Sequence, residues 1–223
     1  MARLLTRSRV VTTLAVLLVL CCYFYNWILA IYWMMVNDCT TPKFYQDSVY
    51  KIVGEVARLY EEHDIPYFLD QGTLLGAARN QGMLPHDSDV DINILHKDLK
   101  RAYDLFQSHP WLISQMQYND GCYVLRVYDR SLGVDTLSPH IDSFHYFELE
   151  DQKKMRFVHG GDFLVEDFFP PVKVPFGPHS LYAPRHFHQI LVTRFGANYM
   201  VNKKVRLQDC KESITMTLFG RPV

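Results

Sequence analysis

The sequence predicts one mixed α+β domain that is preceded by a single N-terminal transmembrane helix. Three observations support this: a long uncharged run near the N-terminus, segments whose apolar residues recur at helical spacing, and short segments in which apolar and polar residues alternate. Helices and strands are mixed without a regular βαβ rhythm, which favours a mainly antiparallel or mixed sheet flanked by helices. The 223 residues are enough for one substantial domain with an appendage. The formal net charge of −1 gives no indication of a nucleic-acid partner.

The transmembrane prediction rests on residues 10–36, which contain no charged residue. At about 1.5 Å per residue, a helix of this length exceeds the roughly 30 Å hydrocarbon core of a bilayer. Arg3, Arg7 and Arg9 precede the run and Asp38 follows it, and this bias places the N-terminus in the cytosol. We therefore expect a cytosolic tail over 1–9, a signal anchor over 10–36, a stem over 37–43 and a lumenal domain over 44–223. A cleaved signal peptide is the alternative.

This organisation predicts a single-pass type II protein of the Golgi or endoplasmic reticulum membrane. Three cysteines would then be lumenal, Cys39, Cys122 and Cys210. Because their number is odd, at least one of them stays free or pairs between chains. The spacing of cysteines and histidines does not suggest a structural zinc site.

The first half of the domain is predicted to alternate between helices and strands. Phe44–His63 is a helix, because its apolar residues recur at helical spacing and Pro66 disfavours helical geometry in the residue before it. A short strand over Tyr67–Asp70 and an Ala- and Leu-rich helix over Thr73–Arg79 follow, and the chain then turns at residues 80–82. Asp89–Leu95 is a strand by strict alternation of apolar and polar residues.

The second half is predicted to contain two further helices and several strands. Asp98–Ser108 is a helix with its apolar residues on one side. The closing helix covers Pro184–Tyr199, with proline near its start and Gly196 near its end. Strands are predicted between these helices, over Cys122–Tyr128, Ile141–Leu149, Met155–Val158 and Val172–Phe176.

Asp89 and Asp91 are the first candidate functional residues. Side chains two apart on a strand point to the same side, with Cα atoms about 6.6 Å apart, so both carboxylates can converge on one cation. Mg²⁺ and Mn²⁺ favour such oxygen ligands and take substrate phosphates as others. The D-x-D pattern alone is also compatible with a solvated acidic strand face, which is common by chance.

A second candidate is the Gly72-Thr73 pair before a short helix. Glycine lets the backbone approach a ligand closely, and a helix N-terminus presents N–H groups to a phosphate. The Thr73 hydroxyl can donate as well, and Arg79 could reach the same anion. A simple turn with Thr73 as the N-cap is the alternative.

Together these features lie in the string GTLLGAARNQGMLPHDSDVDI, residues 72–92, which resembles the signature of the LicD/fukutin family. The family pattern is roughly G-T-L-L-G-A-x-R-x-x-G-x-I-P-W-D-D-D-x-D. The segment RFGANYM near residue 200 is similar to the end of the family's closing helix. The resemblance implies a nucleotidyltransferase-like fold that transfers a phospho-group from a CDP-activated donor to a glycan. The matched positions are Gly72, Thr73, Leu74, Leu75, Gly76, Ala77, Arg79, Gly82, Pro85, Asp87, Asp89 and Asp91.

The resemblance also implies roles for the acidic residues. Asp89 and Asp91 would be the metal-binding pair, with Asp87 an auxiliary carboxylate of the same cluster. The fold uses a third carboxylate on a neighbouring strand, for which Asp142 is our choice and Asp135 the fallback. This third carboxylate would ligate metal or act as a general base toward an acceptor hydroxyl.

For the donor, the resemblance implies that Gly72 and Thr73 hold phosphate, with Arg79 as a further contact. The chain departs from the family pattern at His86, which replaces the usual tryptophan, and at Ser88, which replaces one aspartate. His86 would alter the wall beside the site, whereas Ser88 would point away from the metal face.

Other polar residues have weaker indications of function. Arg126 either faces the site from a central strand or lies on the surface. Lys173 is more typical of a solvated lysine than of a phosphate contact. We assign no functional role to four histidines, which we expect to be structural or exposed: His140, His145, His186 and His188.

The sequence therefore predicts a transferase of the LicD/fukutin type that uses Mg²⁺ or Mn²⁺, with Asp89, Asp91 and Asp142 as catalytic residues. The donor would be CDP-linked and carry ribitol phosphate, phosphocholine or a sugar phosphate. The acceptor would be a glycan or glycoprotein. One alternative is a catalytically inactive member that acts as a glycan-binding or transferase-partner protein. Another is a nucleotidyltransferase that moves the nucleoside monophosphate itself.

Overall fold

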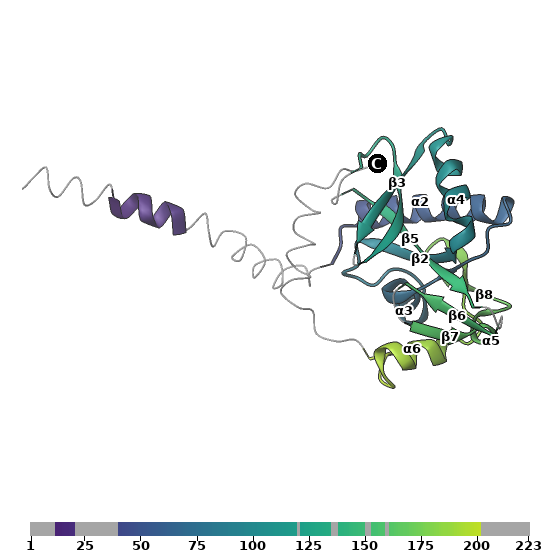
Figure 1. Ribbon diagram of the computed structural model, residues 1–223. Coiled ribbons are helices and arrows are strands. Elements are labelled where there is room, and N and C mark those ends of the chain that lie inside the picture. Colours follow the sequence, from purple (N-terminus) through teal and green to yellow (C-terminus); the bar gives the residue numbers. More distant parts are fainter. Residues whose placement is uncertain are drawn as a thin grey trace, which may run out of the picture.

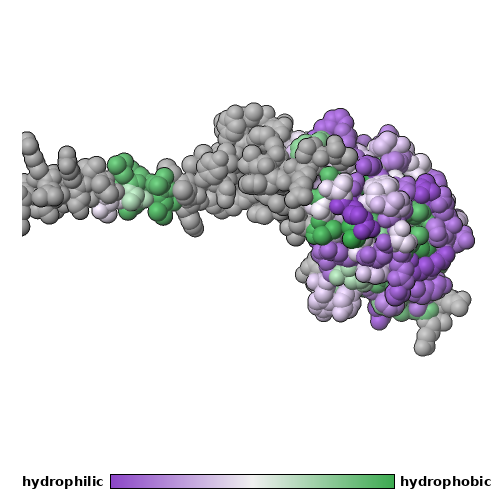
Figure 2. Space-filling view, turned by 90° about the horizontal axis from the view of Figure 1, so that it is seen from above, coloured by the Kyte–Doolittle hydropathy of each residue, from purple (hydrophilic) through white to green (hydrophobic). Residues whose placement is uncertain are grey.

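The computed structural model describes residues 12–20, 40–119, 121–134, 138–149, 153–158 and 161–201. Residues 12–20 form a helix whose leucines and valines are exposed, and they appear as hydrophobic surface in Figure 2. Within the described ranges, none of the helices has the length and apolar character needed to cross a membrane. The rest of the predicted span, residues 10–11 and 21–36, lies outside the described residues.

The domain is a mixed α+β structure built on a seven-stranded sheet with the central order β1-β2-β5-β4-β3 (Figure 1). Strands β2 and β5 are parallel, and the other pairs in the sheet are antiparallel. The sheet strands are β1 (Tyr67–Leu69), β2 (Asp89–Leu95), β3 (Leu112–Asn119), β4 (Cys122–Asp129), β5 (His140–Glu148), β6 (Lys154–Phe157) and β7 (Gly161–Leu164). A separate hairpin consists of β8 (Val172–Phe176) and β9 (His179–Ala183).

The helices agree well with the predicted ones. They are α2 (Lys43–Glu62), α3 (Gln71–Asn80), α4 (Leu99–Gln107), α5 (Val165–Phe168) and α6 (Phe187–Phe195), with a 3-10 turn η1 (His96–Asp98) before α4. The prediction of a mixed α+β domain is confirmed, and each of the four predicted helices of the domain is present. The closing helix is shorter than the predicted Pro184–Tyr199, because it begins only after the N-cap His186 and ends before Gly196. The prediction missed β3, β7, β9 and the single turn of α5. These elements are short or, in β3, carry polar residues on both faces, so they lack a clear alternation.

One face of the sheet is the apolar core face, and α2 packs against it. Ile52, Val53 and Val56 of α2 are fully buried there. The Tyr60 hydroxyl shares a 2.9 Å hydrogen bond with Ser143 of β5, which reaches this face from the middle of the sheet. The apolar residues of β2 point the same way, so its acidic residues point to the opposite face.

The loop that leads into β2 is held against α3 by close backbone packing. A side chain at Gly76 of α3 would overlap the backbone carbonyl of Gly82 and crowd the amide of Leu84. Glycine is therefore required at position 76 for this loop to lie against the helix. The packing sets the path of residues 84–88 and so the start of β2.

Candidate metal and phosphate site

The candidate site is a small polar array on two neighbouring parallel strands. In the register of β2 and β5, Asp89 lies beside His140 and Asp91 lies beside Asp142. Alternate residues of a strand share one face, so all four side chains project from the face opposite α2. The structure thus brings together carboxylates that are about 50 positions apart in the sequence.

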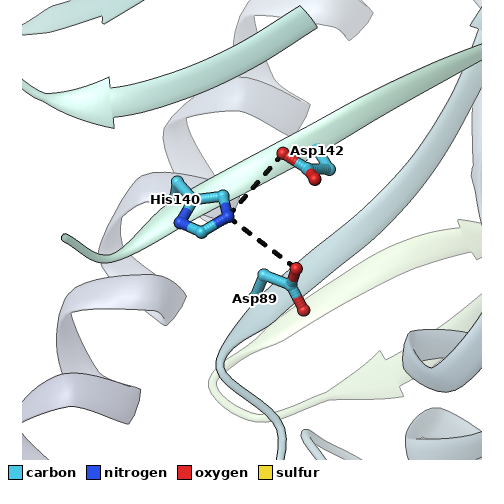
Figure 3. Close-up of side chains that lie close together, drawn as sticks. All are labelled: Asp89, His140 and Asp142. Atoms are coloured by element: carbon cyan, nitrogen blue, oxygen red, sulfur yellow. Dashed lines mark ion pairs between the residues drawn. The ribbon is translucent and has the colours of Figure 1, made fainter. Parts of the chain in front are cut away.

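Within this array, Asp89, His140 and Asp142 form the tightest group (Figure 3). One ligand atom from each lies within 4.8 Å of the other two. The imidazole Nε2 is 3.8 Å from an Asp89 oxygen and 3.8 Å from an Asp142 oxygen. Two carboxylates and one imidazole are a donor set that suits a divalent cation.

His140 is the functional candidate that the sequence analysis missed. Its ring is only 4% exposed, and its Nδ1 lies 2.8 Å from the Ser138 carbonyl oxygen. A carbonyl oxygen can only accept, so Nδ1 donates to it, and Nε2 is the ring nitrogen that faces the carboxylates. The buried Nε2 has no hydrogen-bond partner among the described residues. A buried ring nitrogen that points at two carboxylates fits a cation between them.

Asp142 is held by an arginine of the next strand. Arg126 of β4 donates to both carboxylate oxygens, from Nε at 2.8 Å and from Nη2 at 3.0 Å. The Asp142 side chain is 4% exposed, so the pair is nearly removed from water. Arg126 therefore faces the site, which decides between the two positions that the sequence left open for it. Each carboxylate oxygen has a second lone pair, so Asp142 can contact a cation while this pair stays formed.

The pKa of Asp91 is strongly perturbed by its surroundings. Burial raises its pKa well above the ordinary range, and the neighbouring carboxylates of Asp89, Asp142, Asp87 and Asp70 raise it further. Like charges held this close disfavour a second negative charge unless a cation shares the site. The surroundings of Asp91 therefore favour a bound cation.

The predicted phosphate-binding residues lie next to this array, but within the first turn of α3 rather than before it, because α3 begins at Gln71 with Asp70 as its N-cap. The Thr73 hydroxyl is buried and accepts the backbone N–H of Asp91 at 2.8 Å, which joins α3 to β2. A side chain at Gly72 would come within 3.3 Å of an Asp87 carboxylate oxygen, so this carboxylate lies over the first turn of α3. The start of α3 thus lies directly beside Asp87 and the acidic residues of β2.

Arg79 lies at the other end of α3, about 10 Å along the helix from Gly72. Its guanidinium donates to the carbonyl oxygens of Tyr199 and Val201 beyond α6. In this structure it holds the chain after α6 against α3. The fallback carboxylate, Asp135, lies outside the described residues.

Asp70, directly before α3, forms a buried ion pair that no local sequence pattern predicts. Its carboxylate pairs with Arg194 of α6 and accepts a 2.5 Å hydrogen bond from Asn93. Burial raises the pKa of Asp70, and the nearby guanidinium of Arg194 opposes that rise. The pair connects the closing helix to the segment that precedes the candidate phosphate site.

The described part of the chain also has an open pocket of about 510 Å³. Its walls are mainly aromatic and proline side chains, among them Tyr67, Phe169 and Tyr182. This pocket shares no residue with the polar array on β2 and β5, so pocket size does not identify the candidate site.

Residues 64–186 match the family described as LicD/FKTN/FKRP, nucleotidyltransferase domain. The chain is also similar to two uncharacterized proteins, one from Rickettsia typhi and one from Rickettsia prowazekii. The first is 30% identical over 138 residues, 61% of this chain and 42% of that protein. The second is 28% identical over 142 residues, 61% of this chain and 50% of that protein. The matched part of the chain thus spans half or less of the length of these relatives.

Among solved structures, the chain is similar to the lincosamide antibiotic adenylyltransferase LnuA with lincomycin bound. The identity is 12%, the TM-score is 0.44, and the match covers 79% of this chain and 99% of that one.

Proposed function

The chain belongs to the LicD/FKTN/FKRP family, and from this premise we propose that it is a metal-dependent phosphotransferase. It would transfer ribitol phosphate, phosphocholine or a sugar phosphate from a CDP-activated donor to a hydroxyl of a glycan or glycoprotein. The observation that carries this proposal is the polar array on β2 and β5, where Asp89, Asp91, His140 and Asp142 meet beside the start of α3.

The residues of the array would hold one or two divalent cations, Mg²⁺ or Mn²⁺. The donor set fits such a cation, because His140 Nε2 is buried without a hydrogen-bond partner among the described residues and points at two carboxylates. When bound, the cation would neutralise charge on the donor diphosphate.

In the reaction, the acceptor hydroxyl would attack the donor phosphorus in line with the bond to CMP. A new P–O bond to the glycan forms, the P–O bond to CMP breaks, and a site carboxylate takes the hydroxyl proton. We assign this role to Asp142, and the support is that Arg126 fixes its orientation through two hydrogen bonds. The backbone N–H groups at Gly72 and Thr73 would hold donor phosphate at the start of α3.

Replacement of the acidic pair tests this proposal. We expect Asp89→Ala and Asp91→Ala each to abolish CMP release from CDP-linked donors by the purified full-length protein. Asp104→Ala is a matched control, because Asp104 is exposed on α4 and pairs only with Lys100 among the salt bridges of the described residues. Full activity in both site variants would refute the assignment.

Product analysis separates this proposal from its rivals. Release of CMP with a phospho-group on the acceptor supports phosphotransfer, whereas nucleoside monophosphate on the acceptor supports a nucleotidyltransferase. Calorimetry with CDP and Mn²⁺ addresses the inactive alternative: absence of metal-dependent nucleotide binding would favour a glycan-binding or partner role.

We also propose that the protein is a single-pass type II protein of the Golgi or endoplasmic reticulum membrane with a lumenal domain. The support is the uncharged run at residues 10–36 with three arginines before it, together with the exposed apolar side chains of residues 12–20. Protease protection of a C-terminal tag in intact microsomes, lost when detergent is added, is the expected result. Cleavage of the tag without detergent would refute this orientation.

A further inference from the structure

We propose that His140 is a direct nitrogen ligand of the metal and that the site therefore binds Mn²⁺ in preference to Mg²⁺. This inference rests on the proposed function, which requires a divalent cation at the same array. It goes further in two ways. It identifies a ligand outside the family signature at residues 72–92, and it chooses between Mg²⁺ and Mn²⁺, which carboxylate ligands alone do not discriminate.

The first support is the fixed orientation of the imidazole ring. Nδ1 donates to the Ser138 carbonyl at 2.8 Å, and this bond holds the ring with Nε2 facing the carboxylates of Asp89 and Asp142. Metal-binding histidines characteristically have their second nitrogen held by such a carbonyl, which fixes tautomer and ring orientation. The Tyr128 ring packs against the imidazole, with the ring centroids 5.4 Å apart, and so limits its rotation.

The second support is spacing. The two Nε2–oxygen distances of 3.8 Å exceed hydrogen-bond range. Two atoms that both ligate an ion at roughly 2.0–2.2 Å lie up to about 4.4 Å apart. The separation is thus too long for a direct hydrogen bond and suits a shared ion. A buried nitrogen without a hydrogen-bond partner costs stability unless something contacts it, and a cation would remove that cost.

The metal preference follows from ligand chemistry. Mg²⁺ is a hard cation that takes oxygen ligands and keeps its waters. Imidazole suits transition metals, and carboxylates suit Mn²⁺ as well as Mg²⁺. A site with one imidazole and two or three carboxylates therefore favours Mn²⁺, because Mn²⁺ accepts both ligand types.

Pulsed electron paramagnetic resonance of Mn²⁺ bound to the full-length protein in detergent is the direct test. We expect a ¹⁴N coupling from one imidazole in the wild type. His140→Gln replaces the nitrogen with an amide oxygen of similar reach, so this coupling should disappear. His145→Gln is the matched control, because His145 is equally buried on β5 but lies on the opposite face. It should keep the coupling.

Titration with Mn²⁺ and competition by Mg²⁺ give the second readout. Loss of partners that only orient a ligand typically weakens metal binding 10–100-fold, so loss of the ligand itself should weaken Mn²⁺ binding at least about tenfold. The affinity for Mg²⁺ should change much less in His140→Gln. The ratio of the Mg²⁺ to the Mn²⁺ dissociation constant should therefore fall at least about tenfold. Thermal melting of each variant identifies any loss that comes from misfolding.

The outcomes separate this inference from the proposed function. If wild-type Mn²⁺ shows no ¹⁴N coupling, or if the coupling persists in His140→Gln, His140 is not a ligand, while the acidic site stands. If the wild type binds neither metal, or binds both unchanged in Asp89→Ala, the proposed metal-dependent function fails first, and this inference fails with it.

Discussion

Replacement of Arg194 by methionine is expected to destabilise the domain strongly, because it leaves a buried carboxylate without its cation. The Asp70 side chain is 2% exposed and the Arg194 side chain 13%. Methionine keeps an apolar chain against the rings of Phe157 and Phe163, over which the guanidinium now lies. The change therefore removes mainly the charge and its hydrogen bond.

The expected loss can be bounded from the contacts of Asp70. Removal of one partner from a buried ion pair typically costs about 3–5 kcal/mol. Asp70 retains the 2.5 Å hydrogen bond from Asn93 and one from the backbone of Gln71. We therefore expect the lower end of this range, about 3 kcal/mol of unfolding free energy at pH 7.

This loss should depend on pH. The pKa of Asp70 is raised above its ordinary value of 3.8 in the folded protein, mainly by burial. A carboxyl group whose folded pKa is raised lowers stability once it ionises, so its contribution becomes less favourable as pH rises from 3.8 through the folded pKa. Without Arg194 this pKa rises further. The deficit of Arg194→Met should therefore be larger at pH 7 than at pH 4, where more of Asp70 is protonated.

Urea denaturation at pH 7 and pH 4 measures these differences for the wild type, Arg194→Met, Asp70→Asn and the double variant. Asp70→Asn in the Arg194→Met background should recover part of the lost stability, because it removes the uncompensated charge. The reasoning is refuted if Arg194→Met costs the same at both pH values, or if the double variant is no more stable than Arg194→Met.

Other contacts lead to further expectations. Gly76→Ala should lower the melting temperature and the unfolding free energy, the latter by about 1–3 kcal/mol, because the alanine methyl group would overlap the backbone carbonyl of Gly82. An unchanged melting temperature would contradict this packing. Tyr60→Phe should cost about 1–3 kcal/mol in urea denaturation, because it leaves the buried Ser143 hydroxyl without its 2.9 Å partner. A loss within measurement error would show that this hydrogen bond is not significant. Chelation by EDTA should abolish CMP release and added Mn²⁺ should restore it, whereas full activity in EDTA would disprove metal dependence.

Local patterns made much of the fold predictable. The alternation in Asp89–Leu95 defined β2 to the residue, and the helical spacing after Phe44 located α2 within one residue at each end. The hairpin strand β9 was missed, although the Gly177-Pro178 pair before it is a turn signal. Five residues with two small side chains carry too little periodicity to indicate a strand.

The candidate site was only partly predictable, because much of it depends on pairing between distant strands. Asp142 was chosen because the family resemblance implies a third carboxylate on a neighbouring strand, and it does lie beside Asp91. The role of His140 depends on the register of β5 against β2 and on the Ser138 carbonyl, neither of which leaves a local signal. Alternation in HIDSFHYF does place His140 on the face of Asp142, and this was the available clue.

The ion pair between Asp70 and Arg194 could not be predicted for the same reason. Its partners are separated by 124 positions and meet only when α6 packs near α3. The roles of Gly72, Thr73 and Arg79 in binding donor phosphate stay predictions. The membrane anchor and the compartment also stay predictions.

The parallel pairing of β2 with β5 makes the array sensitive to errors during folding. A slip of one residue between these strands would put Ile141 and Ser143 where His140 and Asp142 now lie, and the array would lose its imidazole and its third carboxylate. The pairing is also expected to form slowly, because β2 and β5 are far apart in the sequence and the β3–β4 hairpin lies between them. A cation that binds only the correct register would stabilise it selectively over the slipped one. Metal supplied during refolding should therefore raise the yield of native protein as well as its activity.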